Sequence, residues 1–572
     1  MNISQVISYI GSSTREGVRS LNNVWAISSV VIAALVAIPI LTVIGLAVSP
    51  EENIWQHLAS TVLPRYVSTT LKLMIGVGVG TLIIGVSTAW IVTTFKFPGR
   101  NFFEWALLLP LAIPAYVIAF LYTDILEYAG PIQGALRDMF GWNSARDYWF
   151  PEIRSLGGAI LMMTLVLYPY VYMLSRAAFL EQSIDVLDVS RSLGQGPWRS
   201  FFNVALPLAR PAIVVGLSLV MMETLNDFGT VDLFAVGTLT LGVFDVWMNM
   251  DNVGGAAQIA VLMLCFVFLL IGAERFSRRK QRFHHTTSRH KKMPLKTVTG
   301  WKLFSILLVC LLPLTFGFLV PVALLVNSAL GHFDEAFRGD FLASAGNSLM
   351  LSGLAAIFAL VVGVILAYGL RLKGGNFLTG ITRFASFGYA IPGAVLAIGV
   401  IIPMAWLDNS IDALARTEFG VSTGLILSGT VFVLVFGYVV RFLALSVGTV
   451  EQSLGRITHN IDGAARTLGA TSGNVLLRVH LPIIRGSMLT AAILVFVDCM
   501  KELPMTMIMR PFNFETLATQ VHQFAAAEQF GQAAPPALAI VVTGILPVIL
   551  LSVVITQFRT REPVLPDVMG PN

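Results

Sequence analysis

Twelve long apolar runs dominate this sequence, and each is about as long as a helix that crosses a lipid bilayer. The hydrocarbon core of a membrane is about 30 Å thick, so a spanning helix needs roughly 20 apolar residues. Only 12% of the residues are charged and 56% are hydrophobic, whereas soluble proteins carry about 25% charged residues. The sequence therefore predicts an all-α polytopic membrane protein and excludes a soluble enzyme. The predicted spans are residues 23–48, 69–95, 102–123, 155–178, 208–230, 255–274, 301–328, 345–370, 383–406, 421–445, 483–506 and 535–558.

The distribution of basic residues predicts the orientation of these spans. Cytoplasmic loops of membrane proteins are enriched in Lys and Arg. If both termini are cytoplasmic, only seven of the 37 Lys and Arg lie in external loops, and the basic segment RRKQRFHHTTSRHKK (278–292) lies inside. The net charge of +5 is too small and too scattered to indicate nucleic-acid binding. The external basic residues are Arg65, Arg137, Arg146, Arg154, Arg338, Arg416 and Arg510.

An internal repeat divides the chain into two halves. Residues 191–210 align with residues 466–485 at an offset of 275, and AIPAYVIAF at 112 recurs as AIPGAVLAI at 390 at an offset of 278. Six spans separate equivalent points, so the halves are predicted to be parallel and related by an axis along the membrane normal. We expect a first module at 1–275 with its core at about 65–275, a basic cytoplasmic linker at 276–300, and a second module at 301–572 with its core at about 343–558.

The large cytoplasmic loop of each half is also repeated. Apolar residues at helical spacing predict a short amphipathic helix in each loop. Gly194 and Gly469 are expected to take the left-handed conformation just after the helix. Pro207 and Pro482 are expected in the first turn of the next helix. Recurrence at the same place in both halves favours a docking site for a cytoplasmic partner over a helix that rests on lipid.

Both loops share one spacing of acidic, small, glycine and Leu-Pro residues. They read Asp188, Val189, Ser190, Gly194, Val204, Leu206, Pro207 in the first half and Gly463, Ala464, Ala465, Gly469, Val479, Leu481, Pro482 in the second. This pattern resembles the EAA loop of binding-protein-dependent ABC importer permeases, and a fused pair of modules would give the type I importer fold. The first loop has Val189 and Ser190 in place of paired alanines, and in the second the acid, Asp462, stands one residue early.

The resemblance implies a set of partners. It implies a bacterial cytoplasmic (inner) membrane permease, two ATPase subunits that dock on the loops, and an external substrate-binding protein. The chain has no GxxxxGK[ST] phosphate loop, so we expect no enzyme activity and no cofactor in it, with ATP bound by the partner subunit. The loop residues expected to couple to the ATPase are Asp188, Arg191, Gly194, Leu206, Pro207, Asp462, Ala464, Ala465, Arg466, Gly469, Leu481 and Pro482.

Further segments resemble the fused permeases of ferric-iron importers. These are METLNDFGTVDLFAV (222–236), TLTLGVFDVW (238–247) and KELPMTMIMRP (501–511). The resemblance implies Fe³⁺ as the transported substrate. Fused permeases for thiamine or phosphonates remain alternatives. A secondary transporter with twelve helices is a different class of alternative, which the repeated docking loop disfavours.

Four acidic residues interrupt the fifth and eleventh predicted spans. Glu223 and Asp227 are four residues apart, and the offset of 275 places Asp498 and Glu502 at the equivalent positions. Charge within a bilayer is costly, so these carboxylates are expected to face the interior of the bundle. As hard oxygen ligands they could line a pathway for a trivalent cation. The alternative is that they pair with Lys501 or cap helices near Gly229 and Pro504.

Overall fold

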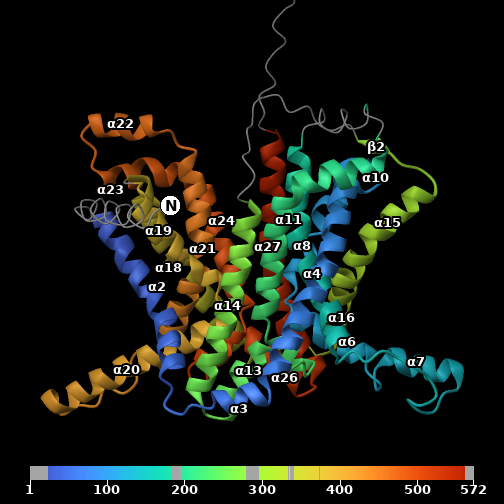
Figure 1. Ribbon diagram of the computed structural model, residues 1–572, viewed down its shortest axis with the longest axis horizontal. Coiled ribbons are helices and arrows are strands. Elements are labelled where there is room, and N and C mark those ends of the chain that lie inside the picture. The colour runs from blue at the N-terminus through green and yellow to red at the C-terminus, as the bar shows by residue number, and fades with distance from the viewer. Residues whose placement is uncertain are drawn as a thin grey trace, which may run out of the picture.

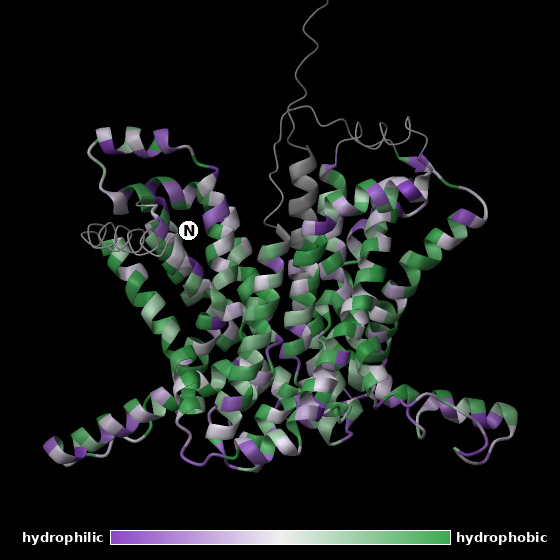
Figure 2. Ribbon diagram, viewed as in Figure 1, coloured by the Kyte–Doolittle hydropathy of each residue, from purple (hydrophilic) through white to green (hydrophobic). Residues whose placement is uncertain are grey.

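The computed structural model describes residues 24–182, 192, 195–278, 295–332, 334, 340–372 and 374–560. The predicted all-α membrane architecture is confirmed. Within these residues, ten helices are long and apolar enough to cross a membrane, and a bent helix pair counts as an eleventh span. The spans are largely hydrophobic, and hydrophilic residues gather toward the two ends of the molecule (Figure 2). The last predicted span, 535–558, lies within α27 (Phe530–Thr560).

The helices follow the order of the predicted spans. The first half contains α2 (Val24–Val48), α3 (Trp55–Ser60), α4 (Leu63–Thr94), β1 (Phe95–Lys96), α5 (Arg100–Ala106), η1 (Leu109–Ala112), α6 (Ala115–Leu126), α7 (Pro131–Phe140), α8 (Leu156–Glu181), α10 (Pro197–Ser200), η2 (Phe201–Ala205), α11 (Leu206–Asn226), α12 (Gly229–Leu233), α13 (Leu239–Phe244), η3 (Asp245–Asn249) and α14 (Val253–Arg278). The second half contains β2 (Lys296–Thr297), α15 (Trp301–Leu314), η4 (Thr315–Leu319), α16 (Val320–Gly331), α18 (Phe341–Leu372), α19 (Asn376–Ala385), η5 (Ser386–Ala390), α20 (Gly393–Phe419), α21 (Val431–Gly455), α22 (His459–Thr467), α23 (Ser472–Val475), η6 (Leu476–His480), α24 (Leu481–Met500), α25 (Pro504–Met509), α26 (Leu517–Ala526) and α27.

The third and ninth predicted spans, 102–123 and 383–406, are not single helices. Each breaks at its Ala-Ile-Pro sequence, and in the first half the two segments meet at 87°. Proline has no N–H and disfavours the α conformation in the preceding residue. Accordingly Ile113 and Ile391 are extended, with ψ of 121° and 130°, and a new helix starts after each proline. The sequence analysis predicted one span in each case because both segments are apolar.

The first long helix of each half packs on the other half. Helix α2 buries Ala26, Ser29, Ala33, Val36, Ile40 and Val43 along one stripe and contacts α18, α19 and α20 of the second half. Its backbone approaches α20 so closely that a Cβ on Gly399 would lie 2.3 Å from the carbonyl oxygen of Pro39. Conversely, α15 and η4 contact α4 and α8 of the first half. The two halves are therefore interlocked by exchanged helices.

Equivalent glycines allow the central helix pairs to pack closely. A Cβ on Gly85 of α4 would lie 2.7 Å from Cβ of Val171 on α8, and a Cβ on Gly363 of α18 would lie 2.7 Å from Cβ of Ser446 on α21. Small residues favour helix association in lipid because they let backbones approach. These contacts relate the halves at offsets of 278 and 275, the two offsets of the sequence repeat.

The two ends of the molecule differ in shape (Figure 1). One end carries α22 and α23 on one side and α10 with the β1–β2 pair on the other. At this end β2, which follows the basic segment, pairs in parallel with β1. The opposite end carries α3, α13 and α26, while α7 and the outer part of α20 project sideways. The predicted orientation makes the first end cytoplasmic.

Replacing Gly85 or Gly363 with Val should destabilise the protein by about 1–3 kcal/mol, because the added side chain would overpack the helix pair. Thermal unfolding in lipid nanodiscs should show a lower midpoint for either variant. Gly353→Val is the matched control, because this position also lies on α18 but a Cβ there meets nothing within 4 Å. Equal midpoints for Gly363→Val and Gly353→Val would contradict the packing argument.

Candidate functional site

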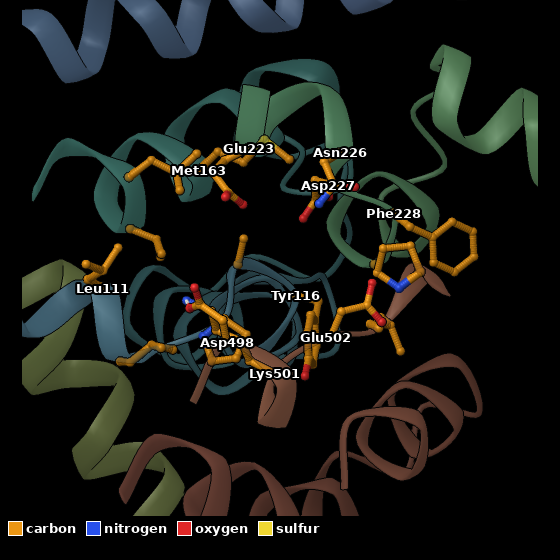
Figure 3. A pocket seen from close by; sticks show the side chains of 18 of the residues that line it. Leu111, Tyr116, Met163, Glu223, Asn226, Asp227, Phe228, Asp498, Lys501 and Glu502 are labelled. Carbon is orange, nitrogen blue, oxygen red and sulfur yellow. Dashed lines mark ion pairs between the residues drawn. The ribbon is translucent and has the colours of Figure 1, made fainter. Parts of the chain in front are cut away.

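A small cavity lies between the two halves, beside the breaks at Pro114 and Pro392. It measures about 110 Å³ and is lined by residues from both halves. Figure 3 shows Glu223 and Asp227 on one side and Asp498 and Lys501 on the other. This volume holds a few water molecules or one small ion, since a water molecule occupies about 30 Å³. All four predicted carboxylates, Glu502 included, line this one cavity.

Two of the carboxylates cap helices that start inside the membrane. Asp227 accepts hydrogen bonds from the backbone N–H groups of Thr230 and Val231 in α12, at 3.0 and 3.2 Å. Glu502 accepts equivalent bonds from Met505 and Thr506 in α25, at 3.0 and 3.1 Å. The first N–H groups of a helix have no partner within the helix, and no bulk water reaches them here. These two acids therefore satisfy donors that would otherwise be unpaired.

The other two carboxylates face the cavity with one neighbour each. Asp498 pairs with Lys501 at 2.9 Å. Glu223 accepts a hydrogen bond of 3.3 Å from the hydroxyl of Tyr389, which belongs to the second half. Arg441 lies 3.8 Å from Glu502 and bonds the side-chain oxygen of Asn226. Four acids therefore face two basic residues around the cavity, which leaves an excess of acidic groups.

The alternative interpretation, in which the carboxylates cap helices or pair with Lys501, agrees with the contacts of three of the four. Asp227 and Glu502 are helix caps, and Asp498 pairs with Lys501. Within the part of the chain that the structure describes, no group of three or more His, Cys, Asp or Glu side chains could hold a metal ion. In this conformation the carboxylates line a shared cavity without forming a chelating set. Among the described residues, Glu223 neither caps a helix nor forms an ion pair, and its hydrogen bond comes from Tyr389.

The sequence analysis missed three polar residues of this site. Asn226 accepts a 2.7 Å bond from the N–H of Gly393 and joins the halves at the second break. Arg441 and Tyr389 complete the wall on the second-half side. Arg441 could have been found, because a charge inside an apolar run indicates a functional position. Tyr389 carries no such signal, since tyrosine is common in membrane helices.

The second of the two repeated loops has the predicted shape. Helix α22 ends at Thr467, and Gly469 has a φ of +83°, in the left-handed region. A Cβ on Gly469 would meet nothing within 4 Å, so its backbone angle and not close packing explains the glycine. Residues Ala464 and Arg466 are exposed and available to a partner. The equivalent residues Asp188, Arg191 and Gly194 lie outside the described residues.

The Leu-Pro sequences differ from expectation in one respect. Pro207 and Pro482 stand in the first turn of α11 and α24, as expected, but the spans as a whole already run from Trp198 and Ser472. A π-helical turn, η2 or η6, directly precedes Leu206 and Leu481. Proline removes a backbone donor from the helix interior, and a wider turn accommodates the missing bond.

Asp462 points into its own chain. Its carboxylate lies 2.6 Å from the guanidinium of Arg371 and 2.8 Å from Nε2 of His480. Arg371 also bonds the carbonyl oxygens of Leu454 and Ile457 at the end of α21. Because the acid is buried, the structure does not support its expected contact with an ATPase. Its ion pairs with Arg371 and His480 instead connect α22 to α18 and η6.

Comparison with known proteins agrees with this architecture. Residues 81–283 match the family described as binding-protein-dependent transport system inner membrane component. The matched segment lies in the first half of the chain. It contains the first break, the first Leu-Pro turn and the Glu223–Asp227 pair of the transport module. The predicted resemblance to importer permeases is therefore confirmed.

Curated relatives extend the similarity to both halves. The Fe(3+)-transport system permease protein FbpB 2 of Haemophilus influenzae is 26% identical over 502 residues, which cover 86% of this chain and 90% of the relative. The putative ferric transport system permease protein FbpB 1 of the same species is 21% identical over 475 residues, covering 78% and 71%. The molybdenum transport system permease protein ModB of Escherichia coli is 28% identical over 206 residues, covering 34% and 86%. One module of this chain is thus the size of a single-module relative.

Replacing Gly469 with Val should weaken the end of α22, because a left-handed backbone costs a branched residue about 1–2 kcal/mol. Hydrogen exchange should become faster at the amides of residues 469 and 470, which bond back to α22. Gly463→Val is the control, since Gly463 lies within α22 and also has open space around its Cβ position. Similar exchange in the two variants would exclude a special role for the backbone angle.

Asp462→Asn should lower the midpoint of thermal unfolding, because it leaves Arg371 buried without its ion-pair partner. Breaking a buried pair costs about 3–5 kcal/mol. Glu451→Gln, which neutralises an exposed acid on α21, should leave the midpoint unchanged. A wild-type midpoint for Asp462→Asn would show that the ion pairs do not hold α22 in place.

Proposed function

We propose that this chain is the permease subunit of an ATP-driven importer that moves ferric iron across the bacterial cytoplasmic membrane. The observation that carries the proposal is the acidic cavity between two interlocked modules. Similarity to ferric permeases over 86% of the chain supports it. Two ATPase subunits would bind at the two cytoplasmic loops, and an external binding protein would deliver the ion.

The size and charge of the cavity favour a small cation as the substrate. About 110 Å³ accommodates an ion with a few waters, whereas organic ligands occupy pockets of about 300–1,000 Å³. In this state the cavity is smaller than such pockets. The excess of carboxylates disfavours an anionic phosphonate. Carboxylate oxygens are hard ligands and suit a hard trivalent cation.

Contacts between the halves support a cycle of alternating access. Near the external end, Asp232 of α12 pairs with His522 of α26 at 3.0 Å, and Arg154 pairs with Glu528 at 2.7 Å. At the cytoplasmic end, α22 and α10 lie far apart (Figure 1). These features correspond to a state closed toward the outside. ATP binding would bring the cytoplasmic loops together and open the outer side, as expected for halves that rock about a central site.

A secondary transporter would need no docking loops, so the repeated loop and the family match favour the importer. Purification of the chain from its native membrane tests the assembly. We expect an ATPase subunit to co-purify at about two copies per chain, and ATP hydrolysis to rise when an Fe³⁺-loaded binding protein is added to proteoliposomes. A chain that transports alone would overturn the importer proposal.

Glu223→Gln combined with Asp498→Asn removes two cavity charges and keeps side-chain size and hydrogen bonding. We expect Fe³⁺ uptake into proteoliposomes to fall at least about tenfold, which corresponds to about 1.4 kcal/mol of lost cation stabilisation. ATP hydrolysis should persist, because the helix caps Asp227 and Glu502 remain.

The control for this variant is Glu52→Gln combined with Glu451→Gln, which removes two exposed carboxylates outside the cavity. It should transport normally. Unchanged uptake in the cavity variant would leave Glu223 and Asp498 as structural groups only. Loss of both uptake and complex assembly would indicate a folding role.

A further inference from the structure

Two helical arms project sideways from the external end of the molecule (Figure 1). The first arm is α7, Pro131–Phe140. The second arm is the outer part of α20, residues 404–419. Each follows one of the Ala-Ile-Pro breaks, and each ends at a left-handed glycine, Gly141 or Gly420, with φ of +70° and +66°. The arms are therefore equivalent elements of the two halves.

One side of each arm holds the segment that returns to the body. In the second arm, Asp408 accepts bonds from the backbone N–H groups of residues 426–428, and Asp412 accepts bonds from those of residues 423 and 424. In the first arm, Gln133 accepts a 2.6 Å bond from the hydroxyl of Tyr148, and Arg137 donates to the same hydroxyl. The shared Phe-Gly end of the arms, at 140–141 and 419–420, sets the local offset at 279, so Gln133 and Arg137 correspond to Asp412 and Arg416.

A second side of each arm exposes large apolar residues at helical spacing. In the second arm these are Leu407, Ile411 and Leu414, of which Leu414 is 64% exposed. In the first arm these are Ile132 and Met139, and Met139 is 77% exposed. At 100° per residue, Asn409 lies roughly opposite the stripe of the second arm, and Asp138 lies about 100–120° away from the stripe of the first. Both arms are therefore amphipathic, and hydrophobic and hydrophilic residues alternate along them in Figure 2.

The position of the arms indicates what covers their apolar stripes. They extend sideways from the end of the molecule that is opposite α22 and α23 (Figure 1). The stripe of the second arm continues from a helix whose inner part, residues 393–400, is buried in the membrane domain. Trp406 of this arm is 69% exposed, and tryptophan is enriched at membrane interfaces.

We propose that the two arms lie in the headgroup region of the outer leaflet, with their apolar stripes in contact with lipid acyl chains. A helix with one apolar and one polar face binds in this plane with the apolar face buried by about 5–10 Å. The arms then widen the contact of each half with the bilayer at the level where the halves meet. The inference depends only on the membrane location of the chain and holds for any transported substrate.

Spin labels on single cysteines test this placement in the full chain in lipid nanodiscs. Labels at Met139→Cys and Leu414→Cys probe the environment of the apolar stripes. Labels at Asp138→Cys and Asn409→Cys are the matched controls on the polar side. Cys265 is exposed and is replaced by Ala, whereas the buried Cys310 and Cys499 are kept. All four labelled positions are exposed, so the substitutions remove no core contact.

The readout is relaxation of each label by oxygen, which concentrates in lipid, relative to a water-soluble nickel chelate. We expect the oxygen-to-nickel ratio to be severalfold higher at positions 139 and 414 than at positions 138 and 409. High and equal nickel accessibility at all four positions would place the arms in water and overturn the proposal. Labels at 139 and 414 that are shielded only after addition of an external binding protein would also overturn it, and would identify a protein interface.

Discussion

Unpaired backbone groups inside the membrane are the constraint on which this structure depends. Lipid offers no hydrogen-bond partners, so every helix that begins within the bilayer needs an internal acceptor for its first N–H groups. Asp227 and Glu502 supply that acceptor for α12 and α25, and Asn226 supplies it for the amide of Gly393. The broken helices bring acidic groups to the centre, and the charged cavity follows from this arrangement.

Local and repeated features could be predicted from the sequence. The apolar runs identified the spans, and the repeat identified both capping acids, because their equivalence is visible at one offset. The glycine at 469 was recognised because a left-handed residue after a helix has a local signature. The sequence analysis predicted single spans where the chain breaks at Ile113 and Ile391. Each of these residues precedes a proline, but hydropathy does not distinguish a straight span from two joined apolar helices.

Features that belong to one half alone could not be found through the repeat. Arg441 corresponds to Val166 and Lys501 to Asn226 at an offset of 275, so the first half has no basic residue at these two positions. The direction of the Asp462 side chain was equally inaccessible, since its partner Arg371 is 91 residues away in the sequence. The two halves thus share a scaffold but differ in charge, and the cavity is asymmetric despite the symmetric framework.

The exchange of first helices has a mechanical consequence. Because α2 packs on the second half and α15 on the first, separation of the halves would break the contacts of both helices. A tilt of one half about the region where the halves meet would keep those contacts. The exchanged helices therefore resist separation of the halves more than they resist rotation of one half against the other.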